Sequence, residues 1–238
     1  MKLKVAPWVV LIIGSLIIFV VLLLYALKLI EPTSPVQNLF LSNITDHQAT
    51  LSWTTKKPTR GQILISEDNK FPFLPLFIKK WEKDDGEKNL STANFYLTHH
   101  ITIGSLKPNK TYYFRIYSGW KKVLQGSFTT GNTLTTILPP NPVYGRVLLQ
   151  DKKTPVIGSL IYLEVKEASA SSALLSALTN PDGRWSIDLA NLRTVNLGKT
   201  FKLATNSAEI LIVDTGQKRV KARTTVGKDK PWSNIILK

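Results

Sequence analysis

The side chains best suited to acid–base or metal chemistry are the 3 histidines of the chain, of which His99 and His100 are adjacent. Neighbouring residues of a β-strand point to opposite faces, so this pair cannot hold one ion between its own two rings. We therefore expect structural roles for both histidines. The acidic run from Asp84 to Glu87 lacks the alternating ligand spacing of a calcium loop, and we interpret it as a solvated turn.

Other kinds of catalytic chemistry also lack the residues that they need. The chain contains no cysteine, which excludes disulfides, zinc–thiolate sites and cysteine nucleophiles. It has no glycine-rich phosphate loop, no His-Glu-x-x-His motif and no Gly-x-Ser-x-Gly motif. The sequence therefore predicts a protein that is not an enzyme and that has no cofactor and no metal site.

The charge of the chain is strongly basic, with a formal net charge of +15 at pH 7. Such a surplus favours binding to anionic wall polymers, lipid headgroups or nucleic acid. Nucleic acid is the least favoured partner, because clustered aromatic and glycine motifs for base stacking are not evident. The alternative interpretation is that the cations are scattered over solvated faces for solubility, since no long basic run occurs.

The N-terminal segment is the most apolar part of the chain. Residues 5–27 contain no charged side chain, and as a helix they would reach about 34 Å, enough for a bilayer core. A cleaved signal peptide would have a shorter apolar run and a small-residue cleavage site, so we expect an uncleaved transmembrane anchor over residues 1–30. Lys2 and Lys4 precede the span, which favours a cytoplasmic N-terminus and extracytoplasmic remainder in a single-pass protein of the cell membrane.

The rest of the chain predicts two β-rich domains. Residues 31–35 contain two prolines and indicate a short, stiff spacer, and residues 131–142 form a second, proline-rich linker. The intervening domains span residues 36–130 and 143–238. Their short runs of β-branched and aromatic residues, broken by turn residues, are typical of an all-β sandwich. The absence of cysteine is typical of a bacterial or archaeal exterior protein.

The expected strands of the two domains follow from this alternation. In the first domain they cover residues 38–44, 49–55, 61–66, 96–103, 111–118 and 123–129. In the second domain they cover residues 144–150, 157–166, 174–179, 184–189, 208–214, 219–225 and 234–238. The fold class is therefore all-β, with two immunoglobulin-like or Greek-key sandwiches in tandem after one transmembrane helix.

The first domain resembles the fibronectin type III family. The segment Leu106-Lys-Pro108-Asn-Lys-Thr-Tyr112 is similar to its tyrosine corner, in which the hydroxyl group of Tyr112 would bond to the corner backbone. Trp53 matches the core tryptophan of the family. The segment from Thr98 to Leu106 is similar to the fibronectin-type domains that precede purple acid phosphatase catalytic domains. That likeness suggests, as one alternative, an accessory subunit of a separately encoded hydrolase.

The second domain resembles the carboxypeptidase regulatory-like family, which implies a transthyretin-like Greek-key sandwich. The likeness rests on the segment from Gly145 to Leu163 and on the turn Asn180-Pro-Asp182-Gly183, which is followed by Arg184 and Trp185. The match covers about the first half of the domain. The family's usual Gly-Tyr segment is missing after Leu189, so the strand order beyond that residue stays open.

An insertion in the first domain is the best candidate for specific recognition. It spans residues 69–94 and contains the apolar side chains Phe71, Phe73, Leu74, Leu76, Phe77 and Trp81. One interpretation is an exposed patch that contacts a protein partner or the membrane interface. The other is that these side chains cover the edge of the sandwich.

These features favour a non-catalytic surface or envelope protein. Its two sandwiches would serve adhesion, structure or protein–protein interaction at the membrane. Binding of anionic polymers, either wall glycopolymer or DNA, is the alternative that the basic composition motivates. The sequence does not name the partner.

Overall fold

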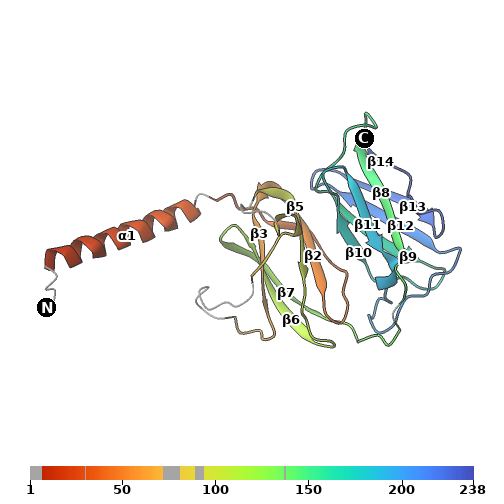
Figure 1. Ribbon diagram of the computed structural model, residues 1–238, viewed down its shortest axis with the longest axis horizontal. Coiled ribbons are helices and arrows are strands. Elements are labelled where there is room, and N and C mark those ends of the chain that lie inside the picture. The colour runs from red at the N-terminus through yellow and green to blue at the C-terminus, as the bar shows by residue number, and fades with distance from the viewer. Residues whose placement is uncertain (1–6, 30, 72–80, 89–93, 137) are drawn as a thin grey trace.

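The computed structural model describes residues 7–29, 31–71, 81–88, 94–136 and 138–238. It contains one helix followed by two bodies built of strands (Figure 1). Helix α1 covers Pro7–Leu29, and apolar side chains along it are exposed, including Leu11 and Phe19. Within the described part of the chain, no helix has the length and hydropathy that crossing a membrane requires.

The described part of the first sandwich contains seven strands in two antiparallel sheets. One sheet has the order β1-β2-β5 and the other the order β4-β3-β6-β7. Fibronectin type III domains share this two-sheet architecture. The strands are β1 (Val36–Ser42), β2 (Ala49–Thr59), β3 (Gly61–Ser66), β4 (Trp81–Lys83), β5 (Tyr96–Ile103), β6 (Thr111–Ser118) and β7 (Lys121–Thr129).

Alternation along the strands builds the core of this sandwich. Leu51 and Trp53 of β2 point to the inside, as do Phe114 and Ile116 of β6, and all four side chains are buried. Burying a side chain of this size contributes about 2 kcal/mol. The outward residues of β2 are Thr50, Ser52 and Thr54, which become important for the contact with the second sandwich.

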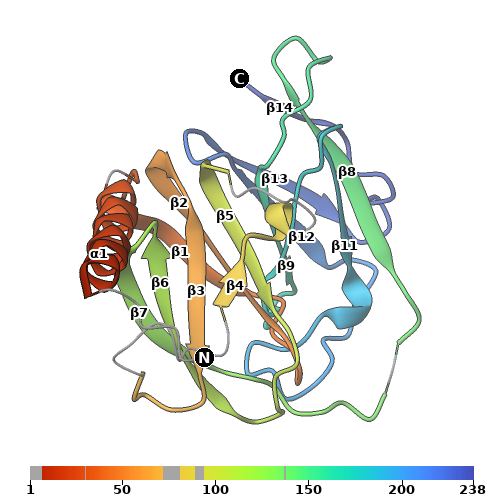
Figure 2. The same ribbon diagram turned by 60° about the vertical axis from the view of Figure 1, so that its left-hand side comes forward.

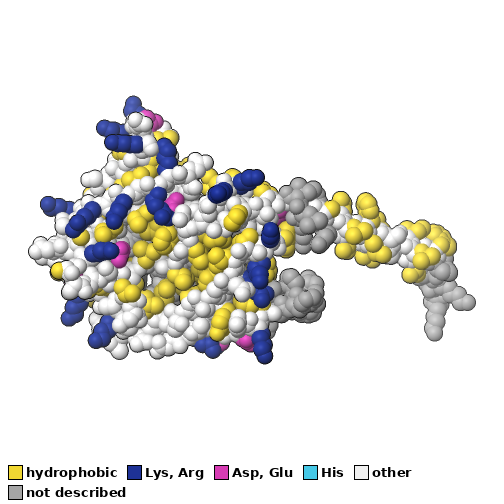
Figure 3. Space-filling model, turned by 180° about the vertical axis from the view of Figure 1, so that it is seen from behind, with side chains coloured by type: hydrophobic (Ala, Val, Ile, Leu, Met, Phe, Trp, Pro, Cys, Tyr) yellow, Lys and Arg dark blue, Asp and Glu magenta, His cyan; other side chains and the backbone are white. Residues whose placement is uncertain are grey.

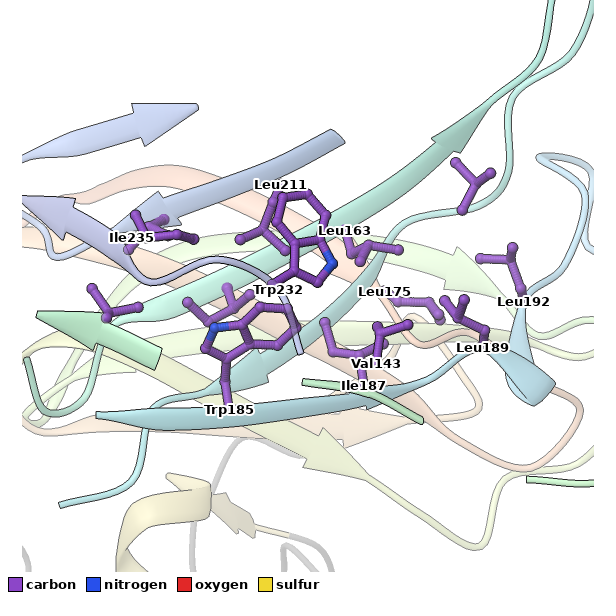
Figure 4. Packing of buried hydrophobic residues seen from close by; sticks show 14 of the residues in the cluster. Val143, Leu163, Leu175, Trp185, Ile187, Leu189, Leu192, Leu211, Trp232 and Ile235 are labelled. Carbon is purple, nitrogen blue, oxygen red and sulfur yellow. The ribbon is translucent and has the colours of Figure 1, made fainter. Parts of the chain in front are cut away.

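The second sandwich contains the strands β8 (Pro142–Leu149), β9 (Leu160–Lys166), β10 (Leu175–Leu178), β11 (Arg184–Asp188), β12 (Ala208–Asp214), β13 (Arg219–Thr225) and β14 (Ile235–Leu237). They form sheets of order β10-β9-β12-β13 and β11-β8-β14, in which only the β14–β8 pairing is parallel among the described strands. Figure 4 shows the core between these sheets, where the rings of Trp185 and Trp232 lie with centroids 6.3 Å apart.

The two sandwiches pack side by side through sheet faces. The sheet that contains β2 and β5 faces the sheet that contains β9 and β10 (Figure 1). Figure 2 shows the same contact from another direction, with β5 beside β9. The linker over residues 131–141 passes along the end of both sandwiches, and Gly131 N donates to Thr45 O at 2.9 Å.

One local expectation was wrong, and a second segment has contacts that the sequence did not predict. The segment from Asp84 to Glu87 is not a solvated turn: Asp84 and Glu87 are buried, and a short 3-10 turn covers Asp85–Glu87. Residues 31–35, predicted as a short and stiff spacer, also pack on the first sandwich, because Ser34 is buried and its N–H donates to Ser118 Oγ at 3.0 Å. In both cases a tertiary partner supplies hydrogen bonds that a solvated segment would take from water.

Candidate functional site

The face of the first sandwich that meets the second is polar, although it is fully buried. Thr50, Ser52 and Thr54 lie in a row on the outer face of β2, because every second residue of a strand points the same way. They are exposed by only 0%, 0% and 1%. Buried polar groups are costly unless they are hydrogen-bonded, so this row marks a contact with specific partners.

Ser176 of β10 is the centre of that contact. Its Oγ lies 2.7 Å from Ser42 Oγ and 2.9 Å from His100 Nε2, and it accepts from Asn43 Nδ2 at 3.1 Å. The side chain of Asn43 also bonds the backbone of Ser176, accepting from its N–H at 2.9 Å and donating to its carbonyl at 3.0 Å. Asn43 thereby pairs the backbone N–H and carbonyl groups of Ser176 at the edge strand β10, as a neighbouring strand would.

His100 connects Ser176 to an acidic side chain. Its Nδ1 lies 2.7 Å from Asp85 Oδ2, and Asp85 also accepts from the N–H and the hydroxyl group of Thr102. Burial alone would raise the pKa of Asp85, but the hydrogen bond and charge of His100, together with Lys88 and Thr102, hold that pKa well below its ordinary value. Asp85 is therefore a carboxylate at neutral pH.

His99 makes a parallel arrangement inside the first sandwich. Its Nδ1 lies 2.6 Å from Asp84 Oδ2, and its Nε2 lies 3.2 Å from Thr59 Oγ1. The ring stacks on Trp53 with centroids 4.8 Å apart. Asp84 accepts as well from His100 N at 2.8 Å, so one buried carboxylate holds both the ring of His99 and the backbone beside it.

Other contacts extend the interface on both sides of Ser176. Ser52 Oγ lies 2.9 Å from the hydroxyl group of Tyr162, whose ring packs on Phe40 with centroids 4.7 Å apart. Burial raises the pKa of Tyr162. At the linker end, Arg193 Nη2 lies 3.2 Å from Asp46 Oδ1, which forms an ion pair between the two sandwiches.

A cavity of about 340 Å³ lies beside this contact and is bounded by both sandwiches. Its lining is mostly apolar and includes Tyr96, Ile157 and Leu178, while Asp84 and Asp85 form one wall. The oxygen atoms of both aspartates are already bonded to His99, His100, Lys88 and Thr102. The acidic wall therefore offers little free hydrogen-bonding capacity to a ligand.

The order Asp85–His100–Ser176 is that of a hydrolase relay of carboxylate, imidazole and hydroxyl group. Such a relay needs a hydroxyl group that a substrate can reach. Ser176 is instead 7% exposed, and its Oγ has partners in Ser42 and Asn43 besides the histidine. This geometry suits a hydrogen-bonded link between the sandwiches. Among the described residues, no group of three or more His, Asp or Glu side chains is placed to hold a metal ion.

The structure places the residues of the fibronectin-like signature at the predicted corner. The hydroxyl group of Tyr112 accepts from Lys107 N at 2.9 Å, and Leu106 is buried against the core. Pro108 lies exposed in the turn between β5 and β6. Trp53, which the resemblance predicts as the core tryptophan, is 1% exposed and lies in the core of the first sandwich.

The signature of the second sandwich lies around one turn. Gly183 has φ +70° and approaches Val147 O so closely that a Cβ atom would lie 2.5 Å from it, which only glycine permits. Asp182 O accepts from Arg146 Nε at 2.8 Å. The turn joins β10 to β11, which belong to different sheets, and Trp185 enters the core directly after it.

Two described side chains of the insertion, Phe71 and Trp81, pack on side chains of β6 at the outer face of the β4-β3-β6-β7 sheet. The guanidinium carbon Cζ of Arg115 lies 4.1 Å from the ring centroid of Phe71, and Trp81 packs on Tyr117 with ring centroids 5.0 Å apart. Leu64, which is paired with Trp81 across β3 and β4, is 1% exposed although it points away from the core. These contacts fit the interpretation that the insertion covers the sandwich. Phe73, Leu74, Leu76 and Phe77 lie outside the described residues.

The sequence did not single out Asn43, Asp85 or Ser176 as a set. The adjacent histidines were a usable signal, because alternation requires one ring to face away from the core of its own sandwich. A polar face on β2 was a second signal, since Thr50, Ser52 and Thr54 are all hydroxyl residues. The partners themselves come from distant parts of the chain.

Comparisons with known proteins give remote likenesses only. No family model and no curated protein matches the chain. The structure of PhoD is similar over 47% of this chain with a TM-score of 0.30 and 14% identity, and this chain covers 21% of it. The FN1–FN3 domains of chicken CNTN1 are similar with a TM-score of 0.29 and 13% identity, covering 81% of this chain and 66% of that one.

A further similar structure is a segment of two fibronectin type III domains from chicken tenascin, with a TM-score of 0.25 and 10% identity. It covers 80% of this chain and 99% of the tenascin segment. Function is therefore inferred from the geometry of the chain itself. The resemblance of the second sandwich to carboxypeptidase regulatory-like domains stays a prediction.

Proposed function

We propose that the protein is a non-catalytic, membrane-anchored surface protein that holds two β-sandwiches as one rigid unit for adhesive, structural or protein–protein contact. The observation that carries the proposal is the buried polar contact centred on Ser176. Its hydrogen bonds join β1 and β5 of the first sandwich to β10 of the second. Separating the sandwiches would leave these groups to find new partners.

Rigidity follows from the directionality of these bonds. Domains joined by a flexible linker normally move relative to one another unless a substantial interface restrains them. Here Asn43 bonds both backbone groups of Ser176, and Arg193 anchors the linker end by donating to Asn132 O at 2.6 Å. A net contribution of about 1 kcal/mol for each such bond is enough to favour one relative orientation.

Support for the anchor comes from the uncharged stretch over residues 5–27, which begins ahead of the described residues. The exposed apolar side chains of α1, such as Leu11 at 73%, call for an apolar environment. Lys2 and Lys4 favour a cytoplasmic N-terminus, which leaves both sandwiches outside the cell.

Protease treatment of intact cells that express the full chain tests the topology. We expect both sandwiches to be cut or shaved from the cell surface, whereas a cytoplasmic control protein survives. A carbonate wash should leave the full chain in the membrane fraction. Complete protection of the sandwiches in intact cells, with digestion after lysis, would show that the outward orientation is wrong.

Binding of an anionic polymer is a second candidate, and strand β13 favours it. Arg219, Lys221 and Arg223 share one face of this strand at the edge of the sheet, and all three are exposed. Arg219 is paired with Asp214 at 2.6 Å, while Lys221 and Arg223 lie opposite Ile212 and Ile210. The alternative reason for cations on an edge strand is protection against pairing with other strands.

Polyphosphate binding by the full chain in detergent at low and high salt tests this candidate. The double variant Lys221→Gln/Arg223→Gln should bind several-fold more weakly at low salt, and the wild-type affinity should fall steeply with salt. The matched control is Lys152→Gln/Lys153→Gln, which removes the same charge from an exposed loop. Equal binding by both double variants would contradict a site on β13.

A further inference from the structure

The connection between α1 and the first sandwich is short and fastened at its far end. Helix α1 ends at Leu29, and Glu31 Oε1 lies 2.6 Å from Arg60 Nη1. Ser34 then bonds to both sides of the sandwich end, because its N–H donates to Ser118 Oγ and its Oγ accepts from Lys56 N. Two residues of extended chain span at most about 7 Å, so Arg60 cannot lie far from the end of the helix.

The end of the first sandwich at this attachment is basic and carries an exposed aromatic ring. We call it the proximal end and define it by Lys56, Lys57, Trp120, Lys121 and Lys122. The four lysines are exposed, and Trp120 is exposed by 49%. Figure 3 shows Lys and Arg side chains on the end of the body that faces the helix.

The proximal end surrounds the attachment point on two sides. Lys56 and Lys57 come from the last part of β2, while Trp120 and the other two lysines come from the turn into β7. Gly119 N donates to Arg60 O at 2.9 Å, which joins these two segments beside Glu31. Glu31, the acidic group at this point, is already paired with Arg60.

We propose that the proximal end lies in the headgroup layer of an anionic lipid bilayer, where its four lysines bind lipid phosphate groups and Trp120 lies among the headgroups. This inference rests on the proposed function, in which α1 spans the membrane. The headgroup layer is about 5–7 Å thick on each side, so a connection of at most about 7 Å does not carry the sandwich clear of it.

The chemistry of the proximal end matches that layer. Tryptophan prefers the membrane–water interface because its ring is apolar and its N–H is polar. Lysines within a Debye length of anionic lipids are attracted to them. The first sandwich is joined rigidly to the second. Contact of the proximal end with the headgroups would therefore also fix the direction in which the second sandwich projects, away from α1 (Figure 1).

The test uses the full chain in lipid nanodiscs. Because the chain has no cysteine, Pro58→Cys gives one fluorophore at the proximal end, and Lys153→Cys gives one on an exposed loop of the second sandwich. The discs contain phosphatidylcholine, either alone or with phosphatidylglycerol, and a quencher attached to the lipid headgroups. In discs with phosphatidylglycerol we expect at least threefold stronger quenching at position 58 than at position 153.

Charge reversal provides the second arm of the test. Changing Lys56, Lys57, Lys121 and Lys122 to Glu should reduce quenching at position 58 at least twofold. The matched control changes Lys152, Lys166, Lys199 and Lys202 to Glu, which alters the net charge equally and should leave that quenching unchanged.

The outcomes separate the two proposals. If the chain stays in the discs through a carbonate wash but the fluorophore at position 58 is quenched no more than the one at position 153, the proximal end is not seated and only this inference fails. Equal effects of both charge reversals would overturn it too, because the attraction would then be a property of net charge. If the chain washes off the discs, α1 is not an anchor and both proposals fail.

Discussion

In the first sandwich each of two neighbouring aspartates, one buried and one partly buried, lies against a histidine, whereas in the second a buried glutamate lies close to another carboxyl group. Asp84 and Asp85 are paired with His99 and His100 at 2.6 and 2.7 Å. Glu209 is exposed by 0% and interacts with Asp229, which is exposed by 1%. Both arrangements avoid an isolated buried charge. A histidine stabilises the ionised form of the aspartate beside it, whereas a neighbouring carboxyl group favours the protonated form of the glutamate.

The two arrangements give opposite responses to pH. Burial, together with the hydrogen bond and charge of Asp229, raises the pKa of Glu209 to about 8. The pKa of Asp85 is instead held low by His100. Acid should therefore weaken the first sandwich and its contact with the second, while alkali should weaken the second sandwich.

Removal of Asp84 should have the largest effect. Asp84→Ala leaves the ring of His99 and the N–H of His100 without a buried acceptor, and each lost partner costs about 1–3 kcal/mol. We expect the free energy of unfolding of the first sandwich to fall by about 3–5 kcal/mol in urea titrations followed by hydrogen exchange in β2 and β5. Asp182→Ala, in an exposed turn, is the control and should cost less than about 0.5 kcal/mol.

A loss below about 1 kcal/mol for Asp84→Ala would mean that water replaces the carboxylate. It would also remove the difference between the two sandwiches, because the histidine pairing would then contribute little.

The pH response of Glu209 is the next largest effect. Its folded-state pKa is higher than its ordinary value of about 4.3, so its contribution to stability is complete below pH 4 and is lost as the pH rises toward 8. We expect the second sandwich to lose about 3 kcal/mol between pH 5 and 8, measured by hydrogen exchange in β12.

Glu209→Gln is the matched variant for this prediction. Gln keeps an acceptor for Trp232 Nε1, which donates to Glu209 Oε2 at 3.0 Å, and offers Asp229 an N–H donor that does not titrate. The variant should gain stability relative to the wild type at pH 8 and show a flat profile from pH 5 to 8. An unchanged slope in the variant would assign the pH dependence to another group.

Much of the secondary structure follows from the sequence, because alternation is a local property. The strands β3, β5, β6, β12 and β13 have the bounds that the pattern predicts. Strand β4 was not predicted, since three residues, Trp81–Lys83, are too few to show a period.

The candidate site could be predicted only in part. The sequence shows that His99 and His100 must face opposite ways, and it marks hydroxyl residues on one face of β2. It does not show that Asp84 is buried, because a run of acidic residues with a glycine has the composition of a turn. The contact of Ser176 with Asn43 joins residues 133 positions apart, and no local pattern encodes such a pairing.

Loss of the link between the sandwiches should have a smaller effect on stability and a clear effect on geometry. The double variant His100→Ala/Ser176→Ala removes the hydrogen bond of 2.9 Å across the contact, the bonds of Ser176 Oγ to Ser42 and Asn43, and the partner of Asp85. We therefore expect a cost of about 2–3 kcal/mol. Distances between spin labels at Pro58→Cys and Lys153→Cys should broaden, while hydrogen exchange in the two cores stays slow.

Ser127→Ala, on an exposed position of β7, is the control for this variant and should leave the distance distribution narrow. An equally narrow distribution in the double variant would mean that Asn43 and Arg193 hold the sandwiches without the histidine. Thr59→Ala removes a hydrogen bond to His99, which lies within the first sandwich, so we expect no such broadening for that variant.

Acid should weaken the contact through Asp85, with the smallest of these effects. Since the folded-state pKa of Asp85 is depressed, its contribution is complete above its ordinary pKa of about 3.9 and is lost as the pH falls below that value. Asp85→Asn keeps an acceptor but no charge, so it should cost about 1 kcal/mol at pH 6, measured by urea unfolding. That cost should shrink as the pH falls from 4 to 2, because Asp85 then takes up a proton in the unfolded chain while it stays ionised in the folded one, which removes the stabilising contribution of the wild-type carboxylate. A cost that stays constant down to pH 2 would mean that the charge of Asp85 does not matter, and that its hydrogen bonds to Thr102 alone account for its role.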